Sequence, residues 1–198
     1  MENDISKSAL LIIDMEKSFV DRRSPFCIKG AQETVPRLIR LADSCRRAGL
    51  PVFMIRRIYR SDGTDVERAR LRYWEAAGRP CSDAAEGYLG YDFVEGLEPA
   101  EGDYAINKPR YSAFFATALD MLLRRLDVDT VIVAGTTTPN CVRSTCYDAD
   151  SLDYGVIVPQ DCTSSNTPEI QEANIGDLRR IGVEITTAEE LTAEIDRL

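Results

Sequence analysis

Short apolar runs alternate with longer amphipathic segments along most of the chain, and this alternation constrains the fold more than any other feature of the sequence. Short apolar runs are typical of buried strands, and apolar residues that recur every three or four positions are typical of helices. The predicted strands are 9–13, 51–55, 103–107, 130–134, 155–159 and 183–186. The predicted helices are 33–48, 113–126, 140–152, 168–181 and 188–198. We therefore predict an α/β fold, a doubly wound parallel sheet with helices on both faces.

One segment does not follow this alternation. Residues 61–102 contain many charges, glycines and prolines, so we expect short helices and long loops there. The aromatic pair Tyr73 and Trp74 makes 61–90 a candidate for either a lid or a contact between subunits. The chain has 198 residues and shows no repeat or linker, so we expect a single domain over residues 1–198.

The overall charge argues against one class of function. The chain carries a formal net charge of −9, which is unlike a general nucleic-acid binder. The longest early apolar run, 9–13, is too short for a signal-peptide core or a membrane span. We expect a cytoplasmic protein that binds neither nucleic acid nor membrane.

The chain contains no histidine. This excludes Ser-His-Asp and Cys-His catalysis as well as histidine-ligated zinc, so a general base must be a carboxylate, a lysine or a tyrosine. The six cysteines include no C-x-x-C pair, and we expect them to be reduced. The motif G-x-G-x-x-G is absent after the first predicted strand, which argues against a nicotinamide cofactor. We expect no cofactor and no metal.

Reactive side chains follow several of the predicted strands. Asp14 follows the first, Arg56 and Arg57 follow the second, Lys108 follows the third, and Cys141 comes shortly after the fourth. Ligands of open parallel sheets bind at the carboxyl ends of the strands. The sequence therefore predicts that an acid, a base and a thiol meet at one edge of the sheet.

Cys141 has the most distinctive local setting of the six cysteines. Thr138 suits a helix N-cap and Pro139 suits the first helical position, which places Cys141 in the first turn of a helix. The N-terminus of a helix lowers the pKa of a thiol, so we expect a lowered pKa that makes Cys141 a nucleophile. The alternative is a small buried core residue, which suits Cys45 and Cys146 better.

Asp14 and Lys108 each have a structural alternative. Asp14 is either a general base or a cap of the loop or helix that follows it. Lys108 is either a solvated surface lysine or a fixed ammonium that favours a thiolate and holds a carboxylate in place. The three residues together are far more specific than any one of them.

Three segments resemble the signature segments of a known family. They read ALLIIDMEKSFVD, INKPRYSAFF and VIVAGTTTPNCVRSTCYDAD, and they occur in order across nearly the whole chain. They are similar to those of the isochorismatase-like cysteine hydrolases, a group with nicotinamidases, N-carbamoylsarcosine amidases and biuret hydrolase-like enzymes. The resemblance implies a three-layer fold with a six-stranded parallel sheet. It also implies a catalytic triad of Asp14, Lys108 and Cys141.

The resemblance implies two backbone features as well. A non-proline cis peptide is expected between Thr136 and Thr137. The N–H groups of Thr137 and Cys141 are expected to form an oxyanion hole.

This sequence also departs from the family pattern. Nicotinamidases carry a histidine metal site, which a chain without histidine cannot form, so nicotinamide is a poor candidate for the substrate. Many members have glutamine where this chain has Glu16, which changes the expected polarity of the pocket. Isochorismatases proper have a small residue in place of the cysteine, so Cys141 favours C–N hydrolysis.

We therefore expect a cysteine hydrolase that cleaves an amide or a carbamoyl or ureido C–N bond of a small molecule through a Cys141 thioester. The alternatives are a vinyl-ether hydrolase that uses Asp14 as the acid, and a redox-sensing or ligand-binding module that uses a reactive Cys141. An arginine in the pocket either binds a substrate carboxylate or is solvated or salt-bridged. We also expect a homo-oligomer, a dimer or a tetramer. The candidate substrate-binding residues are Phe19, Arg57, Tyr111 and Phe114.

Overall fold

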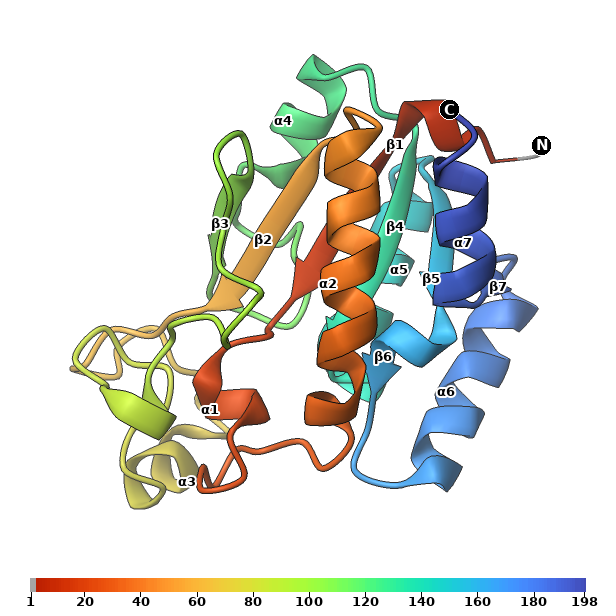
Figure 1. Ribbon diagram of the computed structural model, residues 1–198. Helices are drawn as coiled ribbons and strands as arrows, with labels where there is room; N and C mark the ends of the chain where they lie inside the picture. Colours follow the sequence, from red (N-terminus) through yellow and green to blue (C-terminus); the bar gives the residue numbers. More distant parts are fainter. Residues whose placement is uncertain (1–2) are drawn as a thin grey trace.

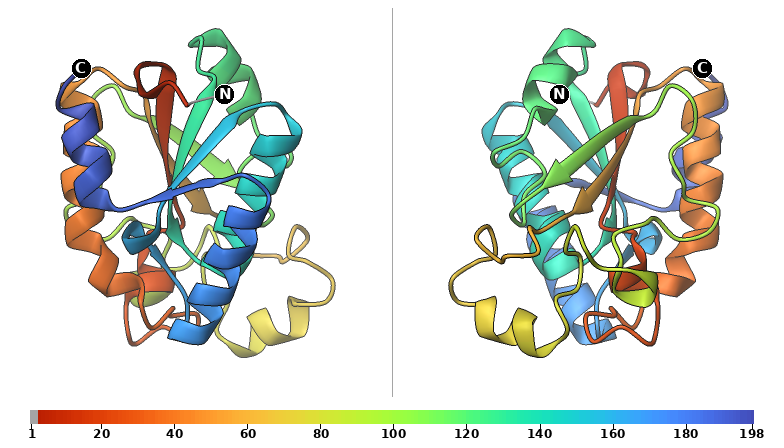
Figure 2. Two further views of the ribbon diagram at one scale, coloured as in Figure 1. Left: turned by 90° about the vertical axis from the view of Figure 1, so that its right-hand side faces the viewer. Right: turned by 90° about the vertical axis from the view of Figure 1, so that its left-hand side faces the viewer.

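The central strands are apolar throughout because both faces of the sheet are covered. In β1 (Ser8–Ile13), Leu10 packs into the core on one face and Leu11 into the core on the other. Continuous apolar strands of this kind are typical of parallel sheets. The computed structural model describes residues 3–198 and has three layers, with the sheet between two layers of helices (Figures 1 and 2).

The sheet has seven strands, all paired in parallel. Six of them follow the order β3-β2-β1-β4-β5-β7, and the short β6 pairs with the end of β4. The strands besides β1 are β2 (Val52–Arg57), β3 (Tyr104–Lys108), β4 (Thr130–Thr136), β5 (Gly155–Pro159), β6 (Thr163–Ser164) and β7 (Glu184–Thr186). The predicted fold class is confirmed, and β6, of two residues, is the strand that the sequence pattern did not predict.

The long helices divide between the two faces of the sheet. Helices α2 and α7 pack on one face, and α4, α5 and α6 pack on the other (Figure 2). Their bounds are α2 (Ala31–Arg47), α4 (Leu119–Arg125), α5 (Arg143–Ser151), α6 (Pro168–Arg180) and α7 (Ala188–Ile195). Among residues 3–198, none of the helices combines the length and the hydropathy needed to cross a membrane.

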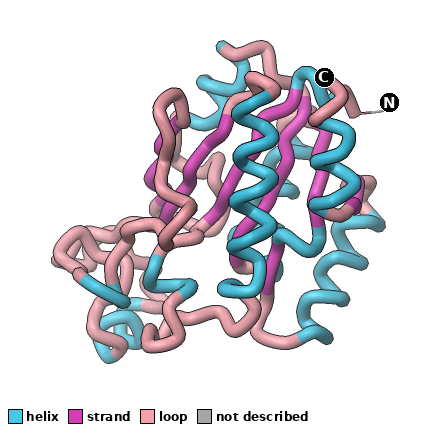
Figure 3. The backbone as a smooth tube through the Cα atoms, in the orientation of Figure 1, coloured by secondary structure: helices cyan, strands magenta, loops and turns pink. Residues whose placement is uncertain are grey.

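The short helices lie beyond the carboxyl ends of the strands. These are α1 (Lys17–Val20) and α3 (Leu71–Ala76), at the lower end of the view in Figure 1. Most of the segment 58–90 around α3 is loop and gathers at the same end (Figure 3). The prediction of short helices and long loops for this part of the chain is confirmed.

Two predicted helices differ from the structure. The helix expected at 113–126 begins only at Leu119, because Ala116 takes a left-handed φ of 56° and the Thr117 hydroxyl donates to Ala113 O (2.6 Å). The helix expected at 140–152 is divided into a π-helical turn, Thr138–Val142, and α5. The N-cap of the π-helical turn is Thr137, not Thr138 as predicted, and no side-chain cap bond forms.

The strand order places a topological switch point between β1 and β4. The chain passes from β1 to β2 on one side, and β4 pairs with β1 on the other. Open α/β sheets bind ligands in the crevice at such a point. The carboxyl ends of β1 and β4 are therefore the place to look for a site.

Gly135 allows β1 and β4 to approach each other at this point. It pairs with Ile13, has φ of 105°, and a Cβ on it would overlap the backbone of Ile13. We expect Gly135→Ala to lower the free energy of unfolding by more than about 3 kcal/mol, because the overlap adds to the cost of the backbone conformation. Urea denaturation measures this loss.

Gly102→Ala is the matched control. Gly102 has φ of 94°, but nothing lies within 4 Å of an added Cβ, so only the backbone cost of about 1–2 kcal/mol should appear. Equal losses in the two variants would contradict the close approach at Gly135.

Candidate active site

Asp14 leaves the end of β1 in an unusual backbone conformation. Its φ is 51°, its N–H donates to Ile55 O (2.8 Å), and it is 1% exposed. Left-handed backbone at a residue other than glycine costs energy and is concentrated at functional sites. The N-cap of α1 is Glu16, so Asp14 does not cap that helix.

Lys108 ends β3 and is completely buried. Its Nζ donates to Asp14 Oδ2 (2.7 Å) and to Arg110 O (3.1 Å). The second carboxylate oxygen, Asp14 Oδ1, is buried and has no hydrogen-bond partner among the described residues. The alternative of a solvated surface lysine is therefore wrong, and the ion pair leaves one carboxylate oxygen free to accept a proton.

Cys141 lies in the π-helical turn that follows β4. Cys141 is 4% exposed, and its carbonyl oxygen accepts a hydrogen bond from the Thr145 hydroxyl (2.7 Å). Cys141, Thr137 and Asn140 line a cavity of about 200 Å³ at the carboxyl ends of the strands. The peptide between Thr136 and Thr137 is cis.

The expected lowering of the Cys141 pKa is wrong. Burial raises the pKa of this thiol to about 11, and the charge of Asp14 acts in the same direction, against the opposing charges of Lys108 and Arg57. The helix-terminus argument fails because burial outweighs the partial charges of the backbone. Cys141 is thus a neutral thiol at rest, and its proton must leave during the attack.

Three of the four candidate substrate-binding residues line the cavity with Cys141. They are Phe19, Arg57 and Tyr111. The fourth, Phe114, does not line it, because its ring packs 5.8 Å from that of Tyr154 under α4 and α5. Phe114 is the residue of the four that the structure places elsewhere.

The segment around α3 and the loop before α2 also line the cavity, and of their residues the sequence singled out Tyr73 but not Arg70 or Phe26. Tyr73 is stacked on Phe26 with 5.5 Å between ring centroids, and Arg70 Nη1 lies 3.4 Å from the Tyr111 hydroxyl. Trp74 instead is buried and donates to Pro80 O (2.8 Å). The segment 61–90 therefore lines the cavity through the exposed Tyr73, and the buried Trp74 anchors the segment.

Glu16 lies buried next to Asp14. Its Oε1 accepts from the Arg57 N–H (3.0 Å), and its Oε2 has no partner among the described residues. Burial, followed by the charge of Asp14, raises the pKa of Glu16 well above its usual value, although Lys108 and Arg57 oppose this. Glu16 therefore keeps its proton to a higher pH than an exposed glutamate does, and in its protonated form it resembles the glutamine that many family members have.

Arg57 is 1% exposed and forms a polar network at the end of β2. Its Nη1 donates to the Tyr59 hydroxyl (2.8 Å) and pairs with Glu67 (3.3 Å). The Tyr59 hydroxyl in turn donates to Glu67 (2.8 Å). Arg57 is thus salt-bridged through one of its three nitrogens, as one of the alternatives for a pocket arginine predicted.

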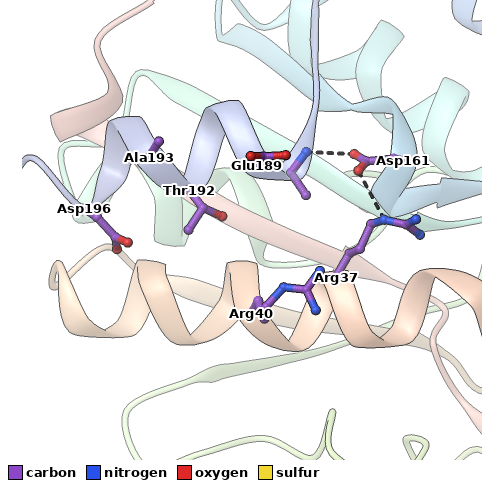
Figure 4. A pocket seen from close by; sticks show the side chains of 8 residues that line it. Arg37, Arg40, Asp161, Glu189, Thr192, Ala193 and Asp196 are labelled. Atoms are coloured by element: carbon purple, nitrogen blue, oxygen red, sulfur yellow. Dashed lines mark hydrogen bonds and ion pairs between the residues drawn. The ribbon is translucent and has the colours of Figure 1, made fainter.

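A larger cavity, of about 410 Å³, lies between α2 and α7, and it differs from the Cys141 cavity in the side chains that line it (Figure 4). Two of its acids are already paired: Asp161 accepts from the Ala188 N–H (2.7 Å) and pairs with Arg37 (3.3 Å), and Asp196 pairs with Arg47 (3.2 Å). No thiol lines it. Within residues 3–198, no cluster of three histidine, cysteine or acidic side chains is arranged to hold a metal ion.

The fold agrees with comparisons to known proteins. An isochorismatase domain model matches residues 8–190. The chain belongs to the isochorismatase family. A solved isochorismatase-family protein from Desulfovibrio vulgaris is 41% identical, has a TM-score of 0.89, and the match covers 96% of this chain and 98% of that one.

Two relatives of this isochorismatase-family chain carry more specific names. A protein of Arabidopsis thaliana named probable inactive nicotinamidase is 38% identical, over 95% of this chain and 96% of its own. An N-carbamoylsarcosine amidase of an Arthrobacter species is 25% identical, over 98% of this chain and 73% of its own. The resemblance found in the sequence is confirmed at the level of the family.

The neutral resting thiol predicts an alkaline labelling profile for this isochorismatase-family protein. We expect iodoacetamide to label Cys141 faster as pH rises, with a midpoint near the pKa of about 11. Mass spectrometry of the labelled peptide measures it, and Cys141→Ser removes the signal. A labelling rate that is already at its plateau at neutral pH would contradict a neutral thiol.

Glu16→Gln should stabilise the protein increasingly as pH rises. Because the pKa of folded Glu16 is raised, the folded side chain keeps its proton to a higher pH than the unfolded one, which loses it above about pH 4.5, so the wild type loses stability by up to about 1.4 kcal/mol per pH unit between the two pKa values. Glutamine has no such loss. Urea denaturation at pH 5 and pH 7 measures the difference between the variant and the wild type.

The exposed Glu194→Gln is the control for removing a carboxyl group, and its effect should be equally small at both pH values. If the advantage of Glu16→Gln is the same at pH 5 and pH 7, Glu16 is ionised in the folded protein.

Proposed function

We propose that this protein is a cysteine hydrolase that cleaves an amide or carbamoyl C–N bond of a small molecule. The observation that carries the proposal is the buried Lys108–Asp14 ion pair, whose two charges act on the Cys141 thiol, with Asp14 Oδ1 unpartnered. Lys108 holds one carboxylate oxygen, and the other is left to take the thiol proton. This set of groups suits nucleophilic catalysis without histidine.

The first half of the reaction forms a thioester. Asp14 takes the proton of Cys141 as Sγ attacks the carbonyl carbon, and the negative charge moves onto the carbonyl oxygen. The N–H groups of Thr137 and Cys141 are the proposed donors to this oxygen. In support, the Thr137 N–H donates to no other described residue. Asp14 then gives its proton to the nitrogen, and the C–N bond breaks.

The second half returns the enzyme to its starting state. Water attacks the thioester carbon while Asp14 takes a proton from it, and the C–S bond breaks as that proton passes to Sγ. Each proton that Asp14 receives is therefore released within one turnover. The raised resting pKa of Cys141 is compatible with this order, because the thiol ionises only as the new bond forms.

The relatives support C–N hydrolysis more than the alternatives. One of them is named an N-carbamoylsarcosine amidase. The chain has no histidine for the metal site of a nicotinamidase, so nicotinamide stays a poor candidate. A redox sensor needs an accessible thiol of low pKa, whereas Cys141 is buried and its pKa is raised.

Asp14→Asn and Lys108→Ala should each lower the rate of ammonia release from a small amide by at least about 10²–10⁴-fold. Asparagine cannot carry the proton, and without Lys108 the carboxylate loses its position. The double variant should be little slower than the slower single one, because the groups act as a unit. Steady-state kinetics on the three variants measures this, with circular dichroism as the test of folding.

The exposed pair Lys17–Asp92 offers a matched control, since its Nζ–Oδ2 distance is 3.3 Å but both side chains face solvent. Lys17→Ala and Asp92→Asn should leave the rate unchanged. The proposal would be overturned if the rate losses of Asp14→Asn and Lys108→Ala multiply in the double variant. It would also be overturned if Cys141→Ser releases ammonia at the wild-type rate. The second result would mean that the C–N bond breaks without a Cys141 thioester and that Cys141 takes no part in the reaction.

A further inference from the structure

The turn that carries Cys141 is held from one side by a single amide side chain. Gln171 belongs to α6, and its Oε1 accepts hydrogen bonds from the hydroxyls of Thr138 (2.7 Å) and Ser165 (2.8 Å). Its Nε2 donates to the Thr163 hydroxyl (2.8 Å). One residue of α6 therefore connects Thr138, the first residue of the turn, to β6 and to the residue that follows β6.

The Thr138 hydroxyl depends on this contact because Thr138 is completely buried. Its oxygen also lies 3.0 Å from Ser164 O, but that carbonyl is shared with the Thr137 hydroxyl (3.1 Å). A hydroxyl has a single hydrogen, and the shorter of its two contacts is the one to Gln171. Buried polar groups nearly always have a hydrogen-bond partner, so Gln171 is the main acceptor for Thr138.

The turn needs support from outside because it is not the start of a regular helix. It is π-helical over Thr138–Val142, and its N-cap, Thr137, makes no side-chain cap bond. Single π-helical turns are rare and are frequent at functional sites. The hydrogen bonds to Gln171 and β6 therefore contribute what a capped helix would supply by itself.

Gln171 lies outside the described lining of the Cys141 cavity, so it acts on a reaction there only through other residues. Thr137 and Cys141 lie one residue before and three residues after Thr138. The carbonyl of Thr137 accepts from the N–H groups of Asn140 (3.1 Å) and Val142 (3.3 Å), which couples the backbone along the turn. A displacement of Thr138 is therefore transmitted to the N–H groups of both Thr137 and Cys141.

We propose that Gln171 is a positioning residue: by holding the Thr138 hydroxyl, it keeps the N–H groups of Thr137 and Cys141 directed at the oxygen that becomes negative in the transition state. The inference rests on the proposed function for the identity of this oxygen, the carbonyl oxygen of the substrate. Gln171 neither binds the substrate nor moves a proton, so its loss should affect the step in which the negative charge forms.

Gln171→Met keeps the length of the side chain and removes the amide that makes these hydrogen bonds. It should lower kcat for ammonia release by about 10- to 100-fold, because a misplacement of about 1 Å costs up to about 10²-fold in rate. KM should change by less than about threefold, since the interaction is made in the transition state. Steady-state kinetics measures both, on whichever of propionamide, succinamate and N-carbamoylglycine the wild type hydrolyses fastest.

The matched control is Gln32→Met. Gln32 is exposed on α2, so the same substitution there should leave kcat and KM unchanged. Circular dichroism of both variants tests whether they fold.

Alkylation of Cys141 by iodoacetamide separates positioning from general damage to the turn. The thiol displaces iodide from a saturated carbon in this reaction, and no oxyanion forms. Gln171→Met should therefore be alkylated at the wild-type rate at the same pH, which mass spectrometry of the Cys141 peptide measures. If hydrolysis and alkylation slow by the same factor, Gln171 only supports the turn and the inference is wrong.

Thr138→Val tests the same hydrogen bond from its other end, because valine keeps the shape of threonine and removes the hydroxyl. It should also lower kcat and leave KM and the alkylation rate unchanged. The double variant with Gln171→Met should be little slower than the slower single one, because both changes remove one contact. Losses that multiply would contradict the inference, and Thr138→Val decides alone if Gln171→Met does not fold.

Two outcomes separate this inference from the proposed function. If the wild type hydrolyses one of the three compounds and Gln171→Met does so at the same rate, the role of Gln171 is wrong and the hydrolase stands. If the wild type hydrolyses none of them, binding of propionaldehyde decides. The Cys141 thiol adds to the aldehyde carbon, its proton passes to the aldehyde oxygen, and that oxygen of the hemithioacetal accepts from the same N–H groups.

Titration with carbon-13-labelled propionaldehyde, followed by NMR, measures the dissociation constant of this adduct. Binding that is weaker by about 10-fold in Gln171→Met than in Gln32→Met, as expected for misplaced hydrogen-bond donors, would support the inference without the hydrolase. Equal binding by the two variants, or no adduct on Cys141 of the wild type, would overturn it.

Discussion

The buried ion pair between Lys108 and Asp14 is the interaction on which the rest of the site depends. Removing two charges from water costs several kcal/mol for each, so such a pair persists only where the surrounding structure fixes both partners. Here the partners come from the ends of β3 and β1, and β2 lies between them. The register of three neighbouring strands therefore determines the 2.7 Å contact, and the position of the free carboxylate oxygen follows from it.

The same burial explains the proton states around the pair. Asp14 is paired with Lys108, and burial raises the pKa of the neighbouring Glu16 and Cys141, which favours their neutral forms. In a medium of low polarity, only a charge with a nearby counter-charge is tolerated. The resting site therefore carries few uncompensated charges. A proton can move between Cys141 and Asp14 without changing the total charge of the site.

The sequence predicted the fold and the three central residues because both depend on local pattern. Apolar runs mark buried strands, and strand ends in a parallel sheet share one edge, so Asp14, Lys108 and Cys141 were found before any coordinates. Two features were missed, one because of a backbone conformation that alanine rarely adopts and the other because of burial by distant segments. The delayed start of α4 depends on the left-handed Ala116, and the pKa of Cys141 depends on how deeply the turn is buried. The walls formed by Arg70 and Phe26 come from loops whose path no periodicity encodes.

The segment around α3 has a consequence for how such a protein can diversify. It belongs to the connection from the carboxyl end of β2 to the start of β3 and reaches the cavity through Arg70 and Tyr73, whereas the reactive groups lie at the carboxyl ends of the strands and in the turn after β4. Insertions and replacements in a surface loop disturb a sheet far less than changes in its strands. Selection can therefore change the entrance of the cavity while the reactive groups are inherited unchanged, so that enzymes with one scaffold can evolve different substrate specificities.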